Sequence, residues 1–371
     1  MIIKGLQKTT LLDFPGKVAC TVFTGGCNFR CPFCHNAALV THIDNSNFFT
    51  EEYVLDYLKK RKGILDGVCI TGGEPLIRKN DVVTLASENP ECTFLIYTNA
   101  TLIDKKLCDD IKKCGNITLA LSIEGDECSN DDRRGQGAYE KTIEAMKLLK
   151  REKILFGISV CYTSRNVNDV TSDEFLDKMV DLGVKYAFYF NFMPVGKGAD
   201  KDLIPTPSQR KYMYYWLKKM RNGHTGKPLF VMDFQDDGEY VGGCIAGGRN
   251  YFHINSNGDI EPCVFIHYSD SNIRTHTLFE ALNNPLFMAY RKGQPFNDNH
   301  LMPCPMLENP HILRKIINET GAKSTDLVCQ ETVEELCSKC DDFSKAWEPV
   351  AKDLWENNPH PKTFTQYYRD R

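Results

Sequence analysis

What the 371-residue sequence lacks narrows its function first. The first residues have no apolar core of a secretory signal, and no run approaches the roughly 18 apolar residues of a membrane span. A net charge of −4 argues against general binding to nucleic acid or to a membrane surface. We therefore expect a cytoplasmic protein with no nucleic-acid partner and no membrane partner, working in a reducing compartment.

Cysteine, in contrast, is abundant, with 16 in the chain. Without a secretory signal, metal ligation is a better interpretation of these residues than a disulfide framework. The most informative are Cys27, Cys31 and Cys34, spaced x3 and x2 with no fourth cysteine in the run. Three thiolates can hold three irons of a cubane iron–sulfur cluster and leave one iron open for chemistry. A zinc knuckle without its fourth ligand, or three core cysteines, are the alternatives.

A second motif follows in Gly72, Gly73, Glu74 and Pro75. Two glycines let backbone carbonyls approach a ligand closely, and the carboxylate of Glu74 suits an ammonium group. Together the two motifs resemble the radical S-adenosylmethionine (radical SAM) superfamily. The resemblance implies a [4Fe-4S] cluster whose open iron binds the amino and carboxylate groups of SAM. It also implies that this second motif hydrogen-bonds the methionine amine.

Six apolar, β-rich runs alternate with segments of helical spacing, which predicts an α/β fold with parallel strands and right-handed crossovers. The runs are Val18–Phe23, Gly67–Thr71, Phe94–Thr98, Ile117–Ile123, Leu155–Tyr162 and Tyr186–Phe192. We expect one helix to begin at the N-cap Thr50, and another over Thr171–Leu182 with a capping box of Thr171 and Glu174. Six units fit the partial (β/α)6 barrel of the radical SAM family, whose active site would lie at the carboxyl ends of the strands.

The resemblance assigns further SAM contacts to these strand ends. The family's Thr-Asn-Gly after the third strand keeps Asn99 but has Ala100 in place of glycine, which puts a left-handed backbone there in question. Ser122 and Glu124 match the Ser-Ile-Asp-Gly whose polar groups approach the ribose and amine of SAM. Arg134 corresponds to an arginine that faces the SAM carboxylate. A solvated salt bridge in the loop is the alternative for this arginine.

Three more residues complete the predicted SAM site. Ser159 would contact the adenosyl group, and Met193 belongs to the backbone platform for adenine. Phe33, between two ligand cysteines, would shield the cluster and touch adenine. Ser159 and the nearby Asn166 are equally interpretable as capping residues, and Phe33 as a core aromatic.

A second group of cysteines follows residue 236. Cys244-x13-Gly258-x4-Cys263 brackets a predicted β-hairpin that turns at Asn257-Gly258 and brings the two cysteines near each other. Cys304, held between two prolines, is a third candidate ligand. The pattern resembles the SPASM/twitch extension of radical SAM enzymes, which binds auxiliary iron–sulfur clusters. We expect one auxiliary cluster on these three cysteines.

The fourth ligand of that cluster is left open. Cys329, Cys337 and Cys340 are candidates, or the site stays open to substrate. Cys337-x2-Cys340 lies in a charged, helix-like stretch, where zinc binding or exposed thiols explain the spacing nearly as well. His253 and His267 could ligate instead, although histidines on strands more often pack or face solvent.

These motifs divide the chain into three parts. We expect a radical SAM core over residues 1–235, a smaller α+β SPASM/twitch-like auxiliary-cluster domain over 236–345, and a C-terminal tail over 346–371. Residues 1–76 also resemble anaerobic ribonucleoside-triphosphate reductase activating proteins, which install a glycyl radical on a partner.

The resemblance implies a radical SAM oxidoreductase or transferase. Such an enzyme reductively cleaves SAM to a 5′-deoxyadenosyl radical and abstracts hydrogen from a peptide or small-molecule substrate. Flavodoxin or ferredoxin would supply the electron, under anaerobic conditions. A glycyl-radical-enzyme activase is the alternative, and a non-catalytic metal or electron-transfer protein is a third hypothesis.

Overall fold

An 8-stranded sheet in the order β1 to β8 organises the fold. The computed structural model describes residues 2–10, 18–31, 34, 38–41, 49–196, 199–223, 225–255, 257–326 and 330–360. β1 is antiparallel to β2, and β2 to β8 are parallel to one another. The strands are β1 (Ile3–Thr10), β2 (Ala19–Thr24), β3 (Gly67–Gly72), β4 (Thr93–Thr98), β5 (Ile117–Ser122), β6 (Phe156–Tyr162), β7 (Tyr186–Asn191) and β8 (Phe230–Asp233).

Helices connect the parallel strands. They are α1 (Ala38–Thr41), α2 (Glu51–Lys60), α3 (Lys79–Glu88), α4 (Lys105–Cys114), α5 (Glu127–Arg134), α6 (Ala138–Arg151), α7 (Val167–Val170), α8 (Asp173–Leu182) and α9 (Pro207–Arg221), with 3-10 turns η1 (Pro75–Arg78) and η2 (Lys201–Leu203). The C-terminal extension contains α10 (Gly238–Val241), β9 (His253–Ile254), β10 (Ile260–Glu261), β11 (Tyr268–Ser269), α11 (Leu278–Leu282), α12 (Pro285–Gly293), α13 (Pro310–Thr320), β12 (Lys323–Ser324) and α14 (Val333–Asn357).

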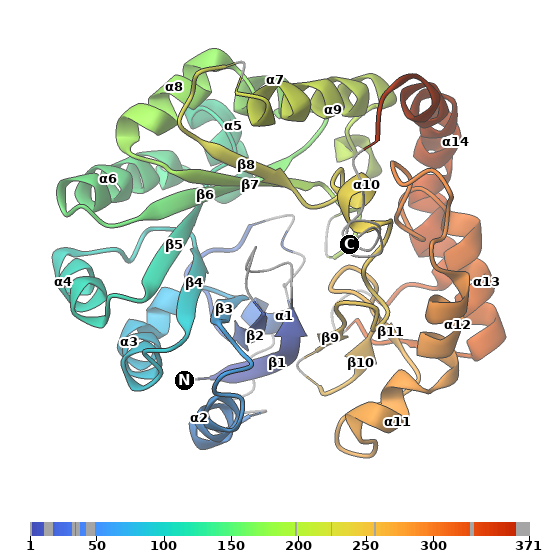
Figure 1. Cartoon of the computed structure of the whole chain (residues 1–371), viewed down its shortest axis with the longest axis horizontal. Coiled ribbons are helices and arrows are strands. Elements are labelled where there is room, and N and C mark those ends of the chain that lie inside the picture. The colour runs from blue at the N-terminus through green and yellow to red at the C-terminus, as the bar shows by residue number, and fades with distance from the viewer. Residues whose placement is uncertain are drawn as a thin grey trace, which may run out of the picture.

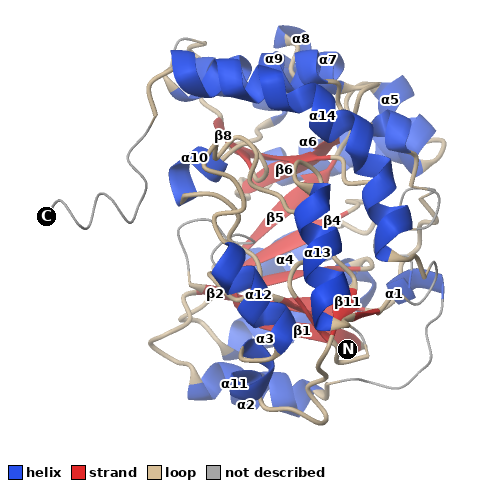
Figure 2. Ribbon diagram, turned by 90° about the vertical axis from the view of Figure 1, so that its right-hand side faces the viewer, coloured by secondary structure: helices blue, strands red, loops and turns tan. Residues whose placement is uncertain are grey.

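The sheet is curved, and the extension occupies its open side (Figure 1). β1 lies at the bottom and β8 at the top of that view, with α2, α3, α4, α6 and α8 along the outer side of the sheet. In the view turned by 90°, α12, α13 and α14 pass in front of the strands (Figure 2). The extension therefore covers the side of the sheet that the connecting helices leave open.

The predicted strands agree closely with the structure. All six runs form parallel strands whose ends lie within one residue of the expected ones. The α/β class and the smaller α+β extension are confirmed as well. Two strands of this sheet were not predicted, the antiparallel β1 and the last strand, β8, and neither was the short pair β11 and β12 in the extension. Helix α14 runs through the expected division between residues 345 and 346, so no end of an element marks that boundary.

The two predicted helix starts had different outcomes. Thr50 is the N-cap of α2 as expected, and its hydroxyl accepts a hydrogen bond from the Tyr53 amide at 3.1 Å. The capping box of Thr171 was wrong, because the short helix α7 precedes it. The Thr171 hydroxyl donates to the Val167 carbonyl at 2.7 Å, and Ser172 caps α8 instead.

The molecule has two main apolar cores. The first lies between the sheet and its outer helices, and the second fills the extension around α12, α13 and α14. Phe192 and Met193, which follow β7, belong to the second core. Arg210 on α9 is fully buried and pairs with Asp236 at 2.5 Å and Glu308 at 3.1 Å, which ties the first region to the extension. Among the described residues, no helix has the length and apolar character that crossing a membrane requires.

Candidate functional site

The ends of β2 and β3 touch at two glycines. The Gly73 amide donates to the Thr24 carbonyl at 2.8 Å, and the Glu74 amide donates to the Gly26 carbonyl at 2.7 Å. A Cβ on Gly73 would lie 2.0 Å from the Gly26 oxygen, and Gly72 has a φ of +109°. Only glycines fit this approach. The glycines therefore allow a close contact with the backbone that leads directly into Cys27, while the expected approach of their carbonyls to a ligand stays a prediction.

Glu74 joins the ends of β3 and β4. Its Oε1 accepts from the Leu76 amide at 2.9 Å and the Thr98 hydroxyl at 2.8 Å, and its Oε2 accepts from the Asn99 amide at 2.7 Å. Burial raises the pKa of this carboxyl, and the three donors oppose that rise. Pro75 follows as the first residue of η1. Three of about four acceptor positions are filled, so the carboxylate keeps room for one more donor, such as an ammonium group.

Asn99 and Ala100 support the cysteine loop. The Asn99 side-chain amide donates to Asn28 Oδ1 at 2.8 Å and lies 4.0 Å from Cys27 Sγ. Ala100 has a φ of +68°. The backbone at this position is therefore left-handed, although alanine replaces the glycine of the Thr-Asn-Gly motif with which the sequence was compared.

The three cysteines of the x3-x2 run, Cys27, Cys31 and Cys34, are each partly exposed. The Phe29 amide donates to Cys27 Sγ at 3.3 Å, and the Cys34 amide donates to the Cys31 carbonyl at 3.2 Å. Burial raises the pKa of Cys27, and the Phe29 amide lowers it. An amide aimed at sulfur favours a thiolate, which is the form that binds iron. Phe33 lies outside the described residues.

Glu124 is paired with arginine in a buried arrangement. Its carboxylate accepts from Arg134, lies 3.7 Å from Arg133, and accepts from the Cys161 amide at 3.0 Å. The salt bridge weighed for Arg134 exists, but it is not a solvated one, because Glu124 is fully buried. Burial disfavours the charge of Arg133, yet Cys161, Glu124 and Cys31 hold its pKa above the usual value. Sequence reasoning passed over Arg133, since two adjacent arginines match the motif equally.

Ser122 and Ser159 lie beside each other on β5 and β6 as register partners, and both are half-buried. Ser122 is the last residue of β5, as predicted, whereas Ser159 lies in the middle of β6, which continues to Tyr162. The Asn166 side chain donates to the Glu124 carbonyl at 2.9 Å and so helps to hold the backbone at Glu124 in place. Met193 is buried in the second core at the end of β7.

The predicted hairpin of the extension is present. β9 and β10 pair antiparallel, and Gly258 in the turn has a φ of +88°. The Gly247 amide donates to the Pro262 carbonyl at 2.9 Å, which brings the loop after Cys244 against Cys263. The Cys263 thiol is among the groups that raise the pKa of Cys244 to about 12, after burial itself. The segments that carry the two cysteines thus lie together, as the predicted hairpin requires, and both cysteines pack against Ile245, Ala246 and Tyr251.

Donors also point at sulfur in this second thiol set. Cys304 Sγ accepts from the amides of the second and third residues after it, both at 3.4 Å. The Tyr251 hydroxyl lies 3.1 Å from Cys263 Sγ and donates to it. Burial raises the pKa of Cys304 well above its usual value, and the two amides oppose that rise. Donors aimed at sulfur also suit the thiolates of a bound cluster, so the residues present fit an iron–sulfur cluster.

The candidates for a fourth ligand are now separated. Cys329 lies outside the described residues, whereas Cys337 and Cys340 are fully buried on α14. The interpretation as exposed thiols was therefore wrong, because α14 turns both into the second core. Burial raises the pKa of Cys337 to about 12. Besides its burial, four thiols raise the pKa of Tyr290: those of Cys244, Cys263, Cys304 and Cys337.

The two histidines considered as ligands contact a carboxylate instead. Glu261 Oε2 lies 3.3 Å from His267 Nδ1 and 3.8 Å from His253 Nε2, and Oε1 accepts from Asn255 at 2.9 Å. Burial lowers the pKa of His253 to about 4. Within the described ranges, no group of three histidine, cysteine or acidic side chains could hold a single metal ion.

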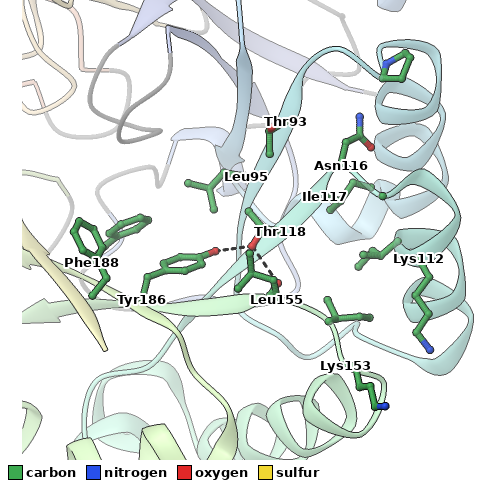
Figure 3. A pocket seen from close by; sticks show the side chains of 15 residues that line it. Thr93, Leu95, Lys112, Asn116, Ile117, Thr118, Lys153, Leu155, Tyr186 and Phe188 are labelled. Carbon is green, nitrogen blue, oxygen red and sulfur yellow. Dashed lines mark hydrogen bonds between the residues drawn. The ribbon is translucent and has the colours of Figure 1, made fainter. Parts of the chain in front are cut away.

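A cavity of about 690 Å³ lies at the other end of the sheet, where β4, β5, β7 and β8 begin. The hydroxyls of Thr118 and Tyr186 meet at 2.9 Å on its wall, beside Phe188 (Figure 3). Cys27, Cys31 and Cys34 follow the carboxyl end of β2, and Cys244, Cys263 and Cys304 lie in the extension. None of these six cysteines lines the cavity.

Two family models match this chain. Residues 21–179 match the radical SAM superfamily, and residues 244–306 match the SPASM iron–sulfur cluster-binding domain. The GTP 3′,8-cyclase of Helicobacter pylori is 31% identical over 67% of this chain and 79% of its own. The chain thus belongs to the radical SAM superfamily. It is an enzyme with a SAM-binding [4Fe-4S] domain and an auxiliary-cluster domain.

Further similarities cover more of the chain. The AdoMet-dependent heme synthase of Methanosarcina barkeri is 23% identical over 85% of this chain and 88% of its own. The structure of Streptococcus suis SuiB bound to S-adenosylmethionine superposes with a TM-score of 0.60, over 84% of this chain and 75% of SuiB, at 19% identity. At that identity, the likeness concerns the fold.

Proposed function

We propose that this enzyme abstracts hydrogen from a small molecule or a peptide and uses an auxiliary cluster in the extension. When bound, the [4Fe-4S] cluster with SAM supplies reductive cleavage of the sulfonium to a 5′-deoxyadenosyl radical, with an electron from a flavodoxin or ferredoxin. The carrying observation is the presence of two separate thiol sets, each with donors aimed at sulfur.

The first thiol set comprises Cys27, Cys31 and Cys34. Next to it, the Gly26–Gly73 contact holds the start of the loop against the end of β3, beside Glu74. Glu74 would accept from the methionine amine with its remaining acceptor position. Residues 1–235 would form this catalytic core.

Charge and hydroxyl groups around that set would orient SAM. Arg133 and Arg134 share the carboxylate of Glu124, and a guanidinium fork can leave one partner for the SAM carboxylate. Ser122, at the end of β5, and its register partner Ser159 on β6 would contact the ribose hydroxyls and the adenosyl group.

The second thiol set would hold the auxiliary cluster. Its ligands would be Cys244, Cys263 and Cys304, with Cys337 of α14 as the fourth. Supporting this choice, Cys337 is fully buried in the core against which the other three cysteines pack, and its thiol, like theirs, raises the pKa of Tyr290. Four protein ligands would make this an electron-relay cluster and not a substrate-binding one.

The substrate class rests on the relatives. A cyclase of GTP and a heme synthase act on small molecules, and SuiB has been solved with its precursor peptide SuiA. The activase alternative is less favoured, because it leaves the second thiol set without a role.

The test is anaerobic reconstitution with iron and sulfide, followed by dithionite and SAM. We expect about eight irons per chain and 5′-deoxyadenosine as a product. Cys244→Ala/Cys263→Ala should hold about four irons and still cleave SAM. The control is Cys114→Ala/Cys128→Ala, which removes two cysteines outside both sets and should keep all the iron.

About four irons in the unaltered chain, unchanged in Cys244→Ala/Cys263→Ala, would remove the auxiliary cluster and favour the activase. Substitution is a better test than truncation after residue 236. Truncation would also remove Glu308 and so leave Arg210 buried without one of its two partners.

A further inference from the structure

Tyr290 on α12 has a buried hydroxyl without a partner. The side chain is fully buried, and its ring packs edge-on against Phe296 with centroids 5.3 Å apart. Among the described residues, no group accepts from or donates to this hydroxyl. Buried phenols usually find a hydrogen-bond partner, so the missing one needs an explanation.

The surroundings of Tyr290 identify the partner. Its ring lies so close to Gly247 that a Cβ there would be 2.5 Å from it, and Gly247 follows Cys244 by three residues. Cys244, Cys263 and Cys304 all pack against the apolar core to which Tyr290 belongs. Burial raises the pKa of its hydroxyl well above the usual value, and the thiols of these three cysteines and of Cys337 raise it further. The unpartnered hydroxyl thus lies in the apolar core against which the cysteines of the second thiol set pack.

A second tyrosine at the same site shows the contact directly. The Tyr251 hydroxyl donates to Cys263 Sγ at 3.1 Å and accepts from the Val264 amide at 2.5 Å. Sulfur is therefore an acceptor for a phenol in this thiol set, and Tyr251 is the reference for what Tyr290 does once a cluster is present.

We propose that Tyr290 donates a hydrogen bond to a sulfur of the auxiliary cluster and thereby raises its reduction potential. This inference rests on the proposed auxiliary cluster. A hydrogen bond to sulfur favours the reduced cluster because reduction increases the negative charge on its sulfurs. Tyr290 is a positioning and tuning residue, since it touches neither SAM nor substrate in this role.

The experiment is a potentiometric titration of the cluster-loaded full chain, followed by electron paramagnetic resonance. It is done in a Cys27→Ala/Cys31→Ala/Cys34→Ala background, so that only the auxiliary cluster contributes. We expect Tyr290→Phe to keep its iron and to shift the midpoint potential to a lower value. Tyr251→Phe should shift it in the same direction.

Tyr186→Phe is the matched control. Its hydroxyl bonds to Thr118 and to the Leu119 carbonyl at the far end of the sheet, so its removal should leave the potential unchanged. An unshifted potential in iron-loaded Tyr290→Phe would overturn the inference while the proposed function stands. No iron in this background would instead overturn the auxiliary cluster itself.

A second measurement does not require Tyr290→Phe to load iron. In Tyr251→Phe protein, Tyr290 is the phenol of the described extension whose hydroxyl has no other partner, since Tyr268 donates to the Glu331 carbonyl. Hyperfine spectroscopy of its reduced cluster in water and in deuterium oxide should reveal an exchangeable proton coupled to the cluster, in addition to those of the two amides that donate to Cys304 Sγ. Absence of that proton would contradict the inference.

Discussion

The two thiol sets differ in how the chain assembles them. Cys27, Cys31 and Cys34 come from one short loop, whereas Cys244, Cys263 and Cys304 come from a hairpin and a distant turn. The first set has polar surroundings, with Asn99, Glu74 and the arginines nearby. The second set packs against a core of apolar residues and tyrosines. A catalytic cluster needs an open, polar side for SAM, whereas an electron relay needs enclosure.

The buried ion pairs of Arg210, which join the sheet region to the extension, give the largest expected change in stability. Arg210→Met would leave Asp236 and Glu308 as buried carboxylates without their cation, and we expect a loss of roughly 3–5 kcal/mol in the free energy of unfolding. Glu308 also accepts from the Cys304 amide at 2.8 Å, so auxiliary iron should be lost before core iron. Urea unfolding and iron counts measure both.

Lys211→Met is the control for that prediction. Lys211 pairs with Asp353 at 2.9 Å, and about half of each side chain is exposed, 42% and 54%. Its loss should cost less than about 1 kcal/mol. Equal effects of the two substitutions would show that the buried network does not couple the regions.

The contact between Gly26 and Gly73, beside the first thiol set, gives the second-largest expected loss of stability. Gly73→Ala places a methyl group against the Gly26 carbonyl and should cost about 1–3 kcal/mol. We expect it to abolish SAM cleavage while the auxiliary iron remains. In the extension, the control Gly293→Ala brings a Cβ no closer than 3.2 Å to the Phe296 ring. This variant should keep both SAM cleavage and the auxiliary iron. Loss of auxiliary iron from Gly73→Ala would contradict the independence of the two sites.

Local sequence predicted the first site better than the second. The spacing of Cys27, Cys31 and Cys34 and the alternation of strands depend on near neighbours, and the strands were confirmed almost to the residue. Tyr290 was missed because its role depends on packing against a loop more than 40 residues earlier. Arg210 was missed for the same reason, since its partners lie on other elements. The cap of α8 was misplaced because Thr171 and Ser172 are adjacent and chemically alike.

The pH response should distinguish the regions next. In the extension, burial lowers the pKa of His253 from 6.5 to about 4. Below pH 6.5, His253 is therefore protonated in the unfolded chain but stays neutral in the folded chain. The free energy of unfolding consequently falls as the pH is lowered toward 4. At pH 5 this amounts to about 2 kcal/mol.

The measurement is urea unfolding at pH 7.5 and pH 5 for the unaltered chain and for His253→Gln. His267, whose pKa is raised, acts in the opposite sense, and comparing the two proteins isolates His253. We expect the unaltered chain to lose about 2 kcal/mol more than His253→Gln on acidification. Parallel losses would contradict a neutral, buried His253.

The smallest effect concerns left-handed residues other than glycine. Lys153 is exposed with a φ of +57°, and Ala100, near the first thiol set, is buried with a φ of +68°. Glycine relieves about 1–2 kcal/mol of backbone strain at either position and loses part of that to chain entropy. Lys153→Gly should therefore stabilise the chain by up to about 1 kcal/mol.

Ala100→Gly should be nearly neutral, because it also removes one buried methyl group worth about 0.8 kcal/mol. Unfolding of both variants in urea measures the difference. A larger gain for Ala100→Gly than for Lys153→Gly would mean that backbone strain is concentrated at the core site. In that case SAM cleavage should fall as stability rises, because strain held at a site helps to fix the groups around it.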